Sequence, residues 1–273
     1  MKRFAIKDYG AAKDVLTEIE GEPRPVDETH VRVETEVGKD ITHVKVGDEV
    51  IVHAISGTYG EEIVVPGKKI VKKPAAMSWE VAAGAVTPWL TTYNLVTHLL
   101  GDKIGETVMV QGASGAVGSL LVQFLKAQGK TVLASAAKRN EALVRQLGVD
   151  QFVAYDEADA GEIFADQADT VIDATKGGRA GKAGMEIMKA GGNFVALNDL
   201  PTEQIKQGNY FSFGPSKEYS DAEALTALAD FSQQLHLTIA EVLPFDLASV
   251  IEGHERLEGH PAAGKIIVKK AAE

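Results

Sequence analysis

Three evenly spaced glycines constrain the fold of this chain more than any other feature. Gly112, Gly115 and Gly118 are separated by two residues each, and they follow the apolar run Thr107–Gln111 directly. The residues after them, Ala116–Gln128, have an amphipathic helical pattern. In such a strand–loop–helix unit the first glycine permits a tight turn, the second admits a pyrophosphate, and the third lets the helix pack against the strand. The spacing therefore predicts a dinucleotide-binding loop, with the diphosphate at the helix N-terminus.

The residues after this loop alternate between strand and helix patterns. Strands are predicted at Thr107–Gln111, Thr131–Ser135, Phe152–Ala154, Thr170–Asp173 and Asn193–Leu197, and helices at Ala116–Gln128, Asn140–Leu147 and Ala180–Lys189. This alternation predicts an α/β domain with a doubly wound parallel sheet of the Rossmann type. Two alternatives stay open for the glycine loop: a turn without a ligand, and the glycine-rich turn of a methyltransferase.

The first third of the chain predicts a small β-rich domain. Strands are expected at Arg3–Ile6, His30–Thr35, Val50–His53 and Ile63–Val65. A helix is expected to begin after Ser78, to break or kink at Pro88, and to resume through about Leu100. A further helix at about Asp221–Leu235 precedes a last strand, Lys265–Lys269, that can return to the β-rich domain. The expected division is therefore 1–82 with 242–273, and 83–241.

The end of the second predicted strand bears on the choice of nucleotide. An NAD site usually has an acidic residue there that binds the ribose hydroxyls, whereas a 2′-phosphate favours a cation. Here Ser135 ends the strand, Lys138 and Arg139 follow, and the first acidic residue is Glu141. The pattern favours NADPH and disfavours a methyltransferase. The alternative is that both cations are solvated loop charges.

Composition excludes several other classes of function. The chain has no Cys, which excludes a thiol nucleophile and any Cys-ligated metal site, and the scattered His residues predict no metal site either. A net charge of −11 disfavours nucleic-acid binding. No apolar run is long enough to span a bilayer, so no membrane partner is expected. We expect a cytoplasmic location.

Several short segments together resemble the zinc-independent medium-chain dehydrogenases/reductases, in their quinone-oxidoreductase-like group. These segments are Met1–Ile6, Val31–Thr35, Val44–Val50, Thr58–Pro66, Pro74–Glu80, Gln111–Gly118, Gly191–Gly192 and Gly264–Val268. The resemblance implies a GroES-like domain beside the Rossmann domain. It also implies an NADPH-dependent enzyme that transfers a hydride to a small quinone, activated alkene or carbonyl substrate, and a homodimer.

The resemblance also implies positions around the cofactor. Ser114, Gly115, Ala116 and Val117 would contact the pyrophosphate, and Ser135, Lys138 and Tyr155 would surround the 2′-phosphate. The remaining positions are Thr87, Asn198 and Phe213 near the nicotinamide, and Lys265 near the bound cofactor. No side chain is identified as the proton donor.

One departure from the family pattern concerns the first domain. Val37–Asp40 passes almost directly to Ile41–Val46, where family members have several dozen more residues that form much of the substrate pocket. The expected GroES-like domain is therefore reduced. This leaves a second interpretation from a different class, namely a protein that binds NADPH without turnover, as a sensor or a minimal scaffold.

Overall fold

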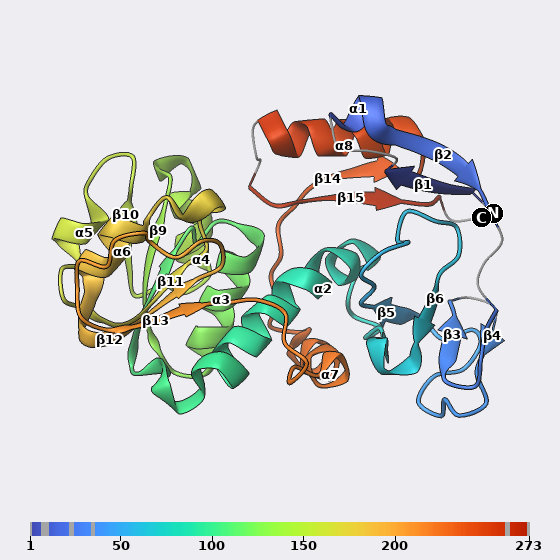
Figure 1. Cartoon of the computed structure of the whole chain (residues 1–273), viewed down its shortest axis with the longest axis horizontal. Coiled ribbons are helices and arrows are strands. Elements are labelled where there is room, and N and C mark those ends of the chain that lie inside the picture. Colours follow the sequence, from blue (N-terminus) through green and yellow to red (C-terminus); the bar gives the residue numbers. More distant parts are fainter. Residues whose placement is uncertain (1, 7–10, 22–24, 34–35, 260–262, 272–273) are drawn as a thin grey trace. The chain divides into compact units, whose positions relative to one another are not determined.

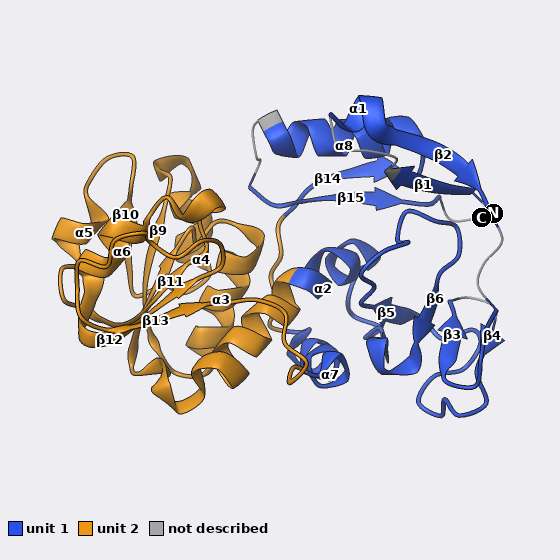
Figure 2. Ribbon diagram, in the orientation of Figure 1, with its two compact units in different colours: residues 1–87, 220–233, 239–273 blue, residues 88–219, 234–238 orange. Residues whose placement is uncertain are grey.

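The structure is a computed structural model that describes residues 2–6, 11–21, 25–33, 36–259 and 263–271. Its contacts divide the chain into two compact units, coloured separately in Figure 2. Unit 1 comprises Met1–Thr87, Ser220–Gln233 and Ile239–Glu273, and unit 2 comprises Pro88–Tyr219 and Gln234–Thr238. This division differs from the expected boundaries at 83–87, 220–233 and 239–241, which group with unit 1.

Unit 2 is built on a six-stranded parallel sheet (Figure 1). Its strands are β8 (Thr107–Gln111), β9 (Thr131–Ala136), β10 (Gln151–Ala154), β11 (Ala168–Asp173), β12 (Met188–Ala196) and β13 (Asn209–Ser212). Their order across the sheet is β10-β9-β8-β11-β12-β13. Counted from β8 as the first strand this is 3-2-1-4-5-6, the Rossmann order, and its switch point lies between β8 and β11. The predicted doubly wound fold is therefore confirmed.

Alternation along the strands buries both faces of this sheet. Val108 and Val110 of β8 belong to one apolar cluster, which includes Leu121 of helix α3 (Ala116–Ala127). Met109 belongs to a second cluster, which includes Met185 of helix α6 (Gly181–Ile187). The helices of unit 2 that follow α3 are α4 (Glu141–Gln146), α5 (Ala160–Ile163) and α6 (Gly181–Ile187). Because successive strand residues face opposite sides, two helical layers are needed to cover the sheet.

Helix α2 (Trp79–Asn94) differs from the expectation at Pro88. Its start is as predicted, since the Ser78 hydroxyl accepts a hydrogen bond from the Val81 N–H at 3.2 Å. The helix then runs through Pro88 without a break and continues as a π-helical turn, Leu95–Leu100. A proline inside a helix costs about 3 kcal/mol. The side chains around it outweigh this cost because they are deeply buried, with Trp89 fully inaccessible.

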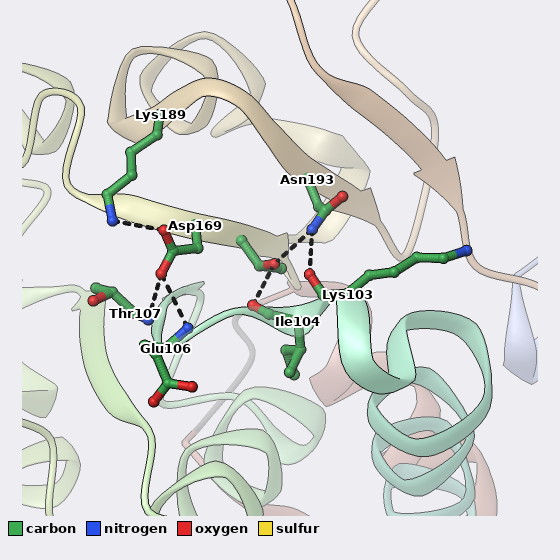
Figure 3. A network of polar contacts seen from close by, with 8 residues as sticks. Lys103, Ile104, Glu106, Thr107, Asp169, Lys189 and Asn193 are labelled. Atoms are coloured by element: carbon green, nitrogen blue, oxygen red, sulfur yellow. Dashed lines mark hydrogen bonds and ion pairs between the residues drawn. The ribbon is translucent and has the colours of Figure 1, made fainter.

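At the amino ends of its strands, unit 2 is held by a partly buried carboxylate (Figure 3). Asp169 accepts hydrogen bonds from the backbone N–H groups of Glu106 at 3.0 Å and Thr107 at 2.9 Å, and from the Lys189 ammonium at 2.6 Å. These contacts join the start of β8 to β11 and β12. They fix the register of the strands that lead to the glycine loop.

A second part of the same network centres on Asn193, which is 7% exposed. Its amide donates to the Lys103 carbonyl at 2.7 Å and to the Thr170 hydroxyl at 3.1 Å. The Thr170 hydroxyl in turn donates to the Ile104 carbonyl at 2.7 Å (Figure 3). The loop that precedes β8 is thereby tied to the two neighbouring strands.

The described residues of unit 1 form small sheets and helices (Figure 1). Its sheets pair β1 (Lys2–Ile6) with β2 (Leu16–Glu20), β3 (His30–Arg32) with β4 (Glu36–Val37) and β6 (Val64–Pro66), β5 (Val50–Val52) with β7 (Ile70–Lys72), and β14 (Ile239–Pro244) with β15 (Lys265–Lys269). Its helices, apart from the start of α2, are α1 (Ala12–Val15), α7 (Asp221–Phe231) and α8 (Leu247–Gly259). The strand expected at His30–Thr35 ends at Arg32, and Glu34 and Thr35 lie outside the described residues. Strand β15 has the predicted bounds.

Candidate functional site

The glycine loop of unit 2 has the backbone geometry that its spacing predicts. Gly112 has a φ of +76°, a left-handed conformation that favours glycine. The N–H groups of Gly112 and Ala113 both donate to the Ser135 carbonyl at 3.0 Å, which ties the turn to the end of β9. A Cβ on Gly118 would lie 2.3 Å from the Gly112 carbonyl oxygen. Gly112 therefore makes the turn, and Gly118 lets α3 start directly against it.

The N-terminus of α3 forms an anion site made of backbone. Gly115 is the N-cap residue, its surface is exposed, and it supplies no side chain to cap the helix. The N–H groups of Ala116 and Val117 lie in the first turn, where a helix offers no internal acceptor. Together with the helix dipole, these groups favour a phosphate at this position. The arrangement fits the pyrophosphate of a dinucleotide.

A side chain that the sequence interpretation missed braces this loop. The Asn140 amide donates to the Ser114 hydroxyl at 3.0 Å, joining the glycine loop to the segment that follows β9. Asn140 belongs to no motif, and only the fold brings it to Ser114. The two residues set the position of a hydroxyl group beside the exposed helix N-terminus.

The fold places more carboxylates around the segment after β9 than its own sequence contains. The Lys138 ammonium pairs with Glu141 at 2.9 Å and with Glu157 at 3.1 Å, and its backbone N–H donates to Asp156 at 2.8 Å. These hydrogen bonds to Glu141 and Glu157 raise the pKa of Lys138. The cation expected to attract a 2′-phosphate is thus already paired with carboxylates.

The other positions expected at the 2′-phosphate differ in exposure. Arg139 is exposed, and Tyr155, directly after β10, is 58% exposed. Ser135 is only 3% exposed, and the contacts above use its backbone carbonyl. The structure brings these residues to the same carboxyl edge of the sheet as the glycine loop.

Two positions expected near the nicotinamide follow the last two strands of this sheet. The Asn198 amide donates to the Thr175 carbonyl at 2.7 Å, which links the loops after β12 and β11. The ring of Phe213, just after β13, stacks on Tyr219 with 5.8 Å between centroids and 9° between planes. Both residues therefore lie at the carboxyl edge of the sheet, where ligands of this fold bind.

Asp173, at the end of β11, is a second residue that the sequence interpretation missed. It is 1% exposed, and its carboxylate accepts hydrogen bonds from the Thr175 N–H at 2.9 Å and the Thr175 hydroxyl at 2.6 Å. Burial raises the pKa of the Asp173 carboxyl, although the hydrogen bonds from Thr175 oppose the shift. The carboxylate shapes the loop that packs on Gly112. A Cβ added at Gly112 would lie 3.0 Å from the Ala174 carbonyl oxygen.

Two expected cofactor residues belong to unit 1 and are described with it. Thr87 lies on α2 and is exposed. Lys265 begins β15 and is partly buried, and this burial lowers the pKa of its ammonium. The structure does not bring either residue together with the glycine loop within one unit.

Comparisons with known proteins find similarity to dehydrogenases and oxidoreductases. Residues 147–268 match a family model described as zinc-binding dehydrogenase. The chain is 30% identical over 173 residues to the mitochondrial NAD(P)H oxidoreductase RTN4IP1 of Danio rerio, covering 59% of this chain and 44% of that protein. The chain spans about half the length, or less, of the curated relatives it matches.

Solved structures share the fold over nearly the whole chain. The quinone oxidoreductase from Coxiella burnetii has a TM-score of 0.84 and 22% identity, covering 99% of each chain. The Escherichia coli quinone oxidoreductase complexed with NADPH has a TM-score of 0.83 and 20% identity, covering 98% of this chain and 99% of that one. These likenesses concern the fold.

Zinc, which the description of the family model names, does not fit the described residues. The chain has no Cys, and the described part contains no cluster of three or more His, Asp or Glu side chains able to hold a metal ion. We derive no step through a metal. Within the same described part, no helix is long and apolar enough to cross a membrane.

Proposed function

We propose that this chain is a member of the medium-chain dehydrogenase/reductase family and that it is an NADPH-dependent, zinc-independent reductase. The observation that carries the proposal is the glycine loop, whose exposed helix N-terminus lies at the switch point of a Rossmann sheet. The names of the relatives, an NAD(P)H oxidoreductase and quinone oxidoreductases, support the same reaction type.

Within this proposal, NADPH is preferred to NADH. The absence of an acidic residue at the end of β9 supports this choice, and so do the exposed Arg139 and Tyr155. The carboxylates Glu141 and Glu157 around Lys138 act against it, because they compete with a 2′-phosphate for the ammonium. We therefore expect the protein to bind NADPH more tightly than NADH, by a factor that these two carboxylates reduce.

When bound, NADPH supplies a hydride for a quinone, an activated alkene or a carbonyl compound. The chain's own part is to hold the cofactor: Ala116 and Val117 offer backbone N–H groups to the pyrophosphate, and the Ser114 hydroxyl is fixed by Asn140. We expect Asn198 and Phe213, which follow β12 and β13, to lie near the nicotinamide end. Acceleration then comes mostly from holding donor and acceptor together.

We propose that the full protein is a cytoplasmic homodimer. β13 ends the strand order of the sheet in unit 2, so its outer edge is open to pairing with a second copy. Sedimentation velocity at several concentrations tests this point. A species of twice the mass is expected, and a monomer at all concentrations would contradict it.

The proposed function is tested by titrating the protein with NADPH and NADH, following cofactor fluorescence, and then adding a panel of quinones and enones at saturation. Selective NADPH binding followed by oxidation is the expected result. Selective binding without oxidation would instead support a sensor or scaffold. That result would agree with the residues expected from the family pattern but missing after Val37–Asp40. Failure of both nucleotides to bind would contradict either function.

A further inference from the structure

Gln111, the last residue of β8, has a buried amide oxygen that receives no hydrogen bond. The residue is 1% exposed, and its Nε2 donates to the Ala180 carbonyl at 3.1 Å. Among the residues that the structure describes, none donates to Oε1 of this amide. A Cβ placed on Gly184 would lie 2.6 Å from the same oxygen, so helix α6 covers it closely. Because buried polar atoms are normally hydrogen-bonded, this acceptor requires an explanation.

Asp173, the last residue of β11, brings a carboxyl group to the same place. Gln111 and Asp173 are neighbours in the register of the parallel strands β8 and β11. Their side chains point to one face of the sheet, since Met109 and Val171, two positions earlier, belong to one apolar cluster. Both side chains also reach Ala180, whose N–H donates to the Asp173 carboxylate and whose carbonyl accepts from Gln111. The amide and the carboxyl are therefore adjacent.

One oxygen of this carboxyl is not used by the neighbouring threonine. The N–H and the hydroxyl of Thr175 both donate to Oδ1 of Asp173, at 2.9 Å and 2.6 Å. An ionised carboxylate only accepts hydrogen bonds, so it can offer nothing to a second acceptor. A protonated carboxyl carries one O–H donor, which can satisfy Gln111 Oε1. Burial acts in the same direction, because it raises the pKa of Asp173.

We infer that Asp173 takes up a proton at Oδ2 and donates it in a hydrogen bond to Gln111 Oε1. The proton comes from solvent, and no covalent bond between heavy atoms changes. The hydrogen bond joins the ends of β8 and β11 where the glycine loop begins. It fixes the segment 174–180, whose Ala174 carbonyl oxygen lies 3.0 Å from the position of a Cβ on Gly112.

This hydrogen bond also regulates the nucleotide site. A loop that is already fixed loses less conformational freedom when a ligand binds. Nucleotide binding therefore strengthens as the pH falls and Asp173 becomes protonated. This second part of the inference rests on the proposed function, whereas the hydrogen bond between Asp173 and Gln111 does not.

The ionisable side chains of the elements around Asp173 have other partners or are exposed. In the segment 174–180 and in α6 they are Lys176, Arg179, Lys182 and Glu186. The first two are exposed, as is Asp199 after β12, and the last two pair with each other at 3.6 Å. β8 has none, and Lys189 of β12 pairs with Asp169 at the amino ends of the strands. Burial and hydrogen bonds therefore govern the protonation of Asp173.

The test follows the carboxyl carbon of Asp173 by ¹³C NMR during a pH titration of the full chain without nucleotide. Asp173→Asn identifies the resonance by its absence. In Gln111→Met the protonated carboxyl loses its acceptor, so the midpoint of the titration should fall by about one pH unit, a ten-fold lower proton affinity. Gln123→Met is the matched control, because Gln123 is a buried glutamine of α3 whose amide is paired. It should leave the Asp173 midpoint unchanged.

Two observations keep the test independent of whether Gln111→Met folds. In the wild type, the side-chain amide resonances of Gln111 should move with the same midpoint as the Asp173 carbon. Gln111→Glu should raise the midpoint, because two adjacent carboxyl groups share one proton before both ionise. An amide that does not follow Asp173, as expected if a water molecule satisfies Oε1, would overturn the inference. Equal midpoints in the wild type and folded Gln111→Met would overturn it as well.

The regulation of nucleotide binding has its own measurement. The ratio of the NADPH affinities of wild type and Gln111→Met, taken at each pH, cancels the titration of the 2′-phosphate itself. This ratio should rise as the pH falls through the wild-type midpoint. A ratio that does not change with pH would overturn the regulation while the reductase function stands. If the wild type binds no nucleotide, the proposed function and the regulation both fail, and the carboxyl titration still decides whether Asp173 donates to Gln111.

Discussion

Single residues decide whether the glycine loop can form. The roles of Gly112 and Gly118 could be predicted because they depend on neighbours a few positions away in the chain. The role of Asn140 could not, since the fold brings its partner Ser114 to it, and the burial that raises the pKa of Asp173 is also set by the fold. The same is true of Glu157, which turns Lys138 from an expected phosphate ligand into one member of an ion-pair cluster.

Gly118→Ala should destabilise unit 2 and weaken nucleotide binding. The new Cβ would lie 2.3 Å from the Gly112 carbonyl oxygen and 2.9 Å from the Ala113 Cα, both backbone atoms that cannot rotate away. Such overpacking costs about 1–3 kcal/mol. Gly253→Ala is the matched control, since its Cβ would meet side chains at 3.7 Å inside α8. Urea unfolding showing equal stability for both variants would contradict the close approach.

Asp173→Asn should change the pH dependence of stability. A carboxyl whose pKa is raised by folding costs stability when it is ionised, and this cost disappears as the pH falls through its folded value. As the pH is lowered from neutral towards acid, the free energy of unfolding of the wild type should therefore increase relative to that of Asp173→Asn. Chemical unfolding at several pH values measures the difference. A constant difference between the two proteins would refute the raised pKa.

Glu157→Gln should improve the preference for NADPH over NADH. The substitution releases Lys138 from one of its two carboxylates and removes a negative charge near the expected 2′-phosphate. Exposed ion pairs are weak because water screens them, so the NADPH affinity should rise only modestly, by up to about five-fold. Glu106→Gln, which removes the same charge from a pair with Lys130, is the control. Equal changes for both nucleotides would mean that Lys138 does not contact the 2′-phosphate.

At the scale of elements, periodicity predicted the strongly patterned segments and missed some of the weakly patterned ones. β8 and α3 lie close to their predicted ranges because burial on both sheet faces and on one helix face leaves a clear pattern. The helix α5 has only four residues, and the strand β14 buries only Leu243, so neither shows a clear pattern. The helix through Pro88 was mispredicted because tertiary packing there outweighs a local preference.

Asn193→Ala should destabilise unit 2 without weakening nucleotide binding. The amide's hydrogen bonds to Lys103 and Thr170 are made in the protein interior, and their loss leaves buried acceptors unsatisfied, at a cost of about 2 kcal/mol. The network lies at the amino ends of the strands (Figure 3), opposite the edge that carries the glycine loop. Urea unfolding and NADPH titration of the folded variant separate the two effects. A large loss of NADPH affinity at full folding would contradict this separation.

At the scale of the whole molecule, the doubly wound parallel sheet of unit 2 could be predicted from sequence because βαβ units leave few alternatives. Unit 1 was less predictable: its strands are short, and segments as distant as Lys2–Ile6 and Lys265–Lys269 both belong to it. The shortened stretch at Val37–Asp40 remains a prediction about the family pattern. If that prediction is right, turnover depends on how much of the substrate pocket unit 1 retains, whereas cofactor binding depends on it less.

The central claim is that the glycine loop of unit 2 binds a dinucleotide. Amide chemical shifts of the ¹⁵N-labelled protein, recorded during an NADPH titration, test it most directly. The account predicts that the largest shifts fall on Ser114, Gly115, Ala116 and Val117, and that Asn140 moves with Ser114. Saturable binding that leaves these amides unmoved, or no binding at all, would contradict it.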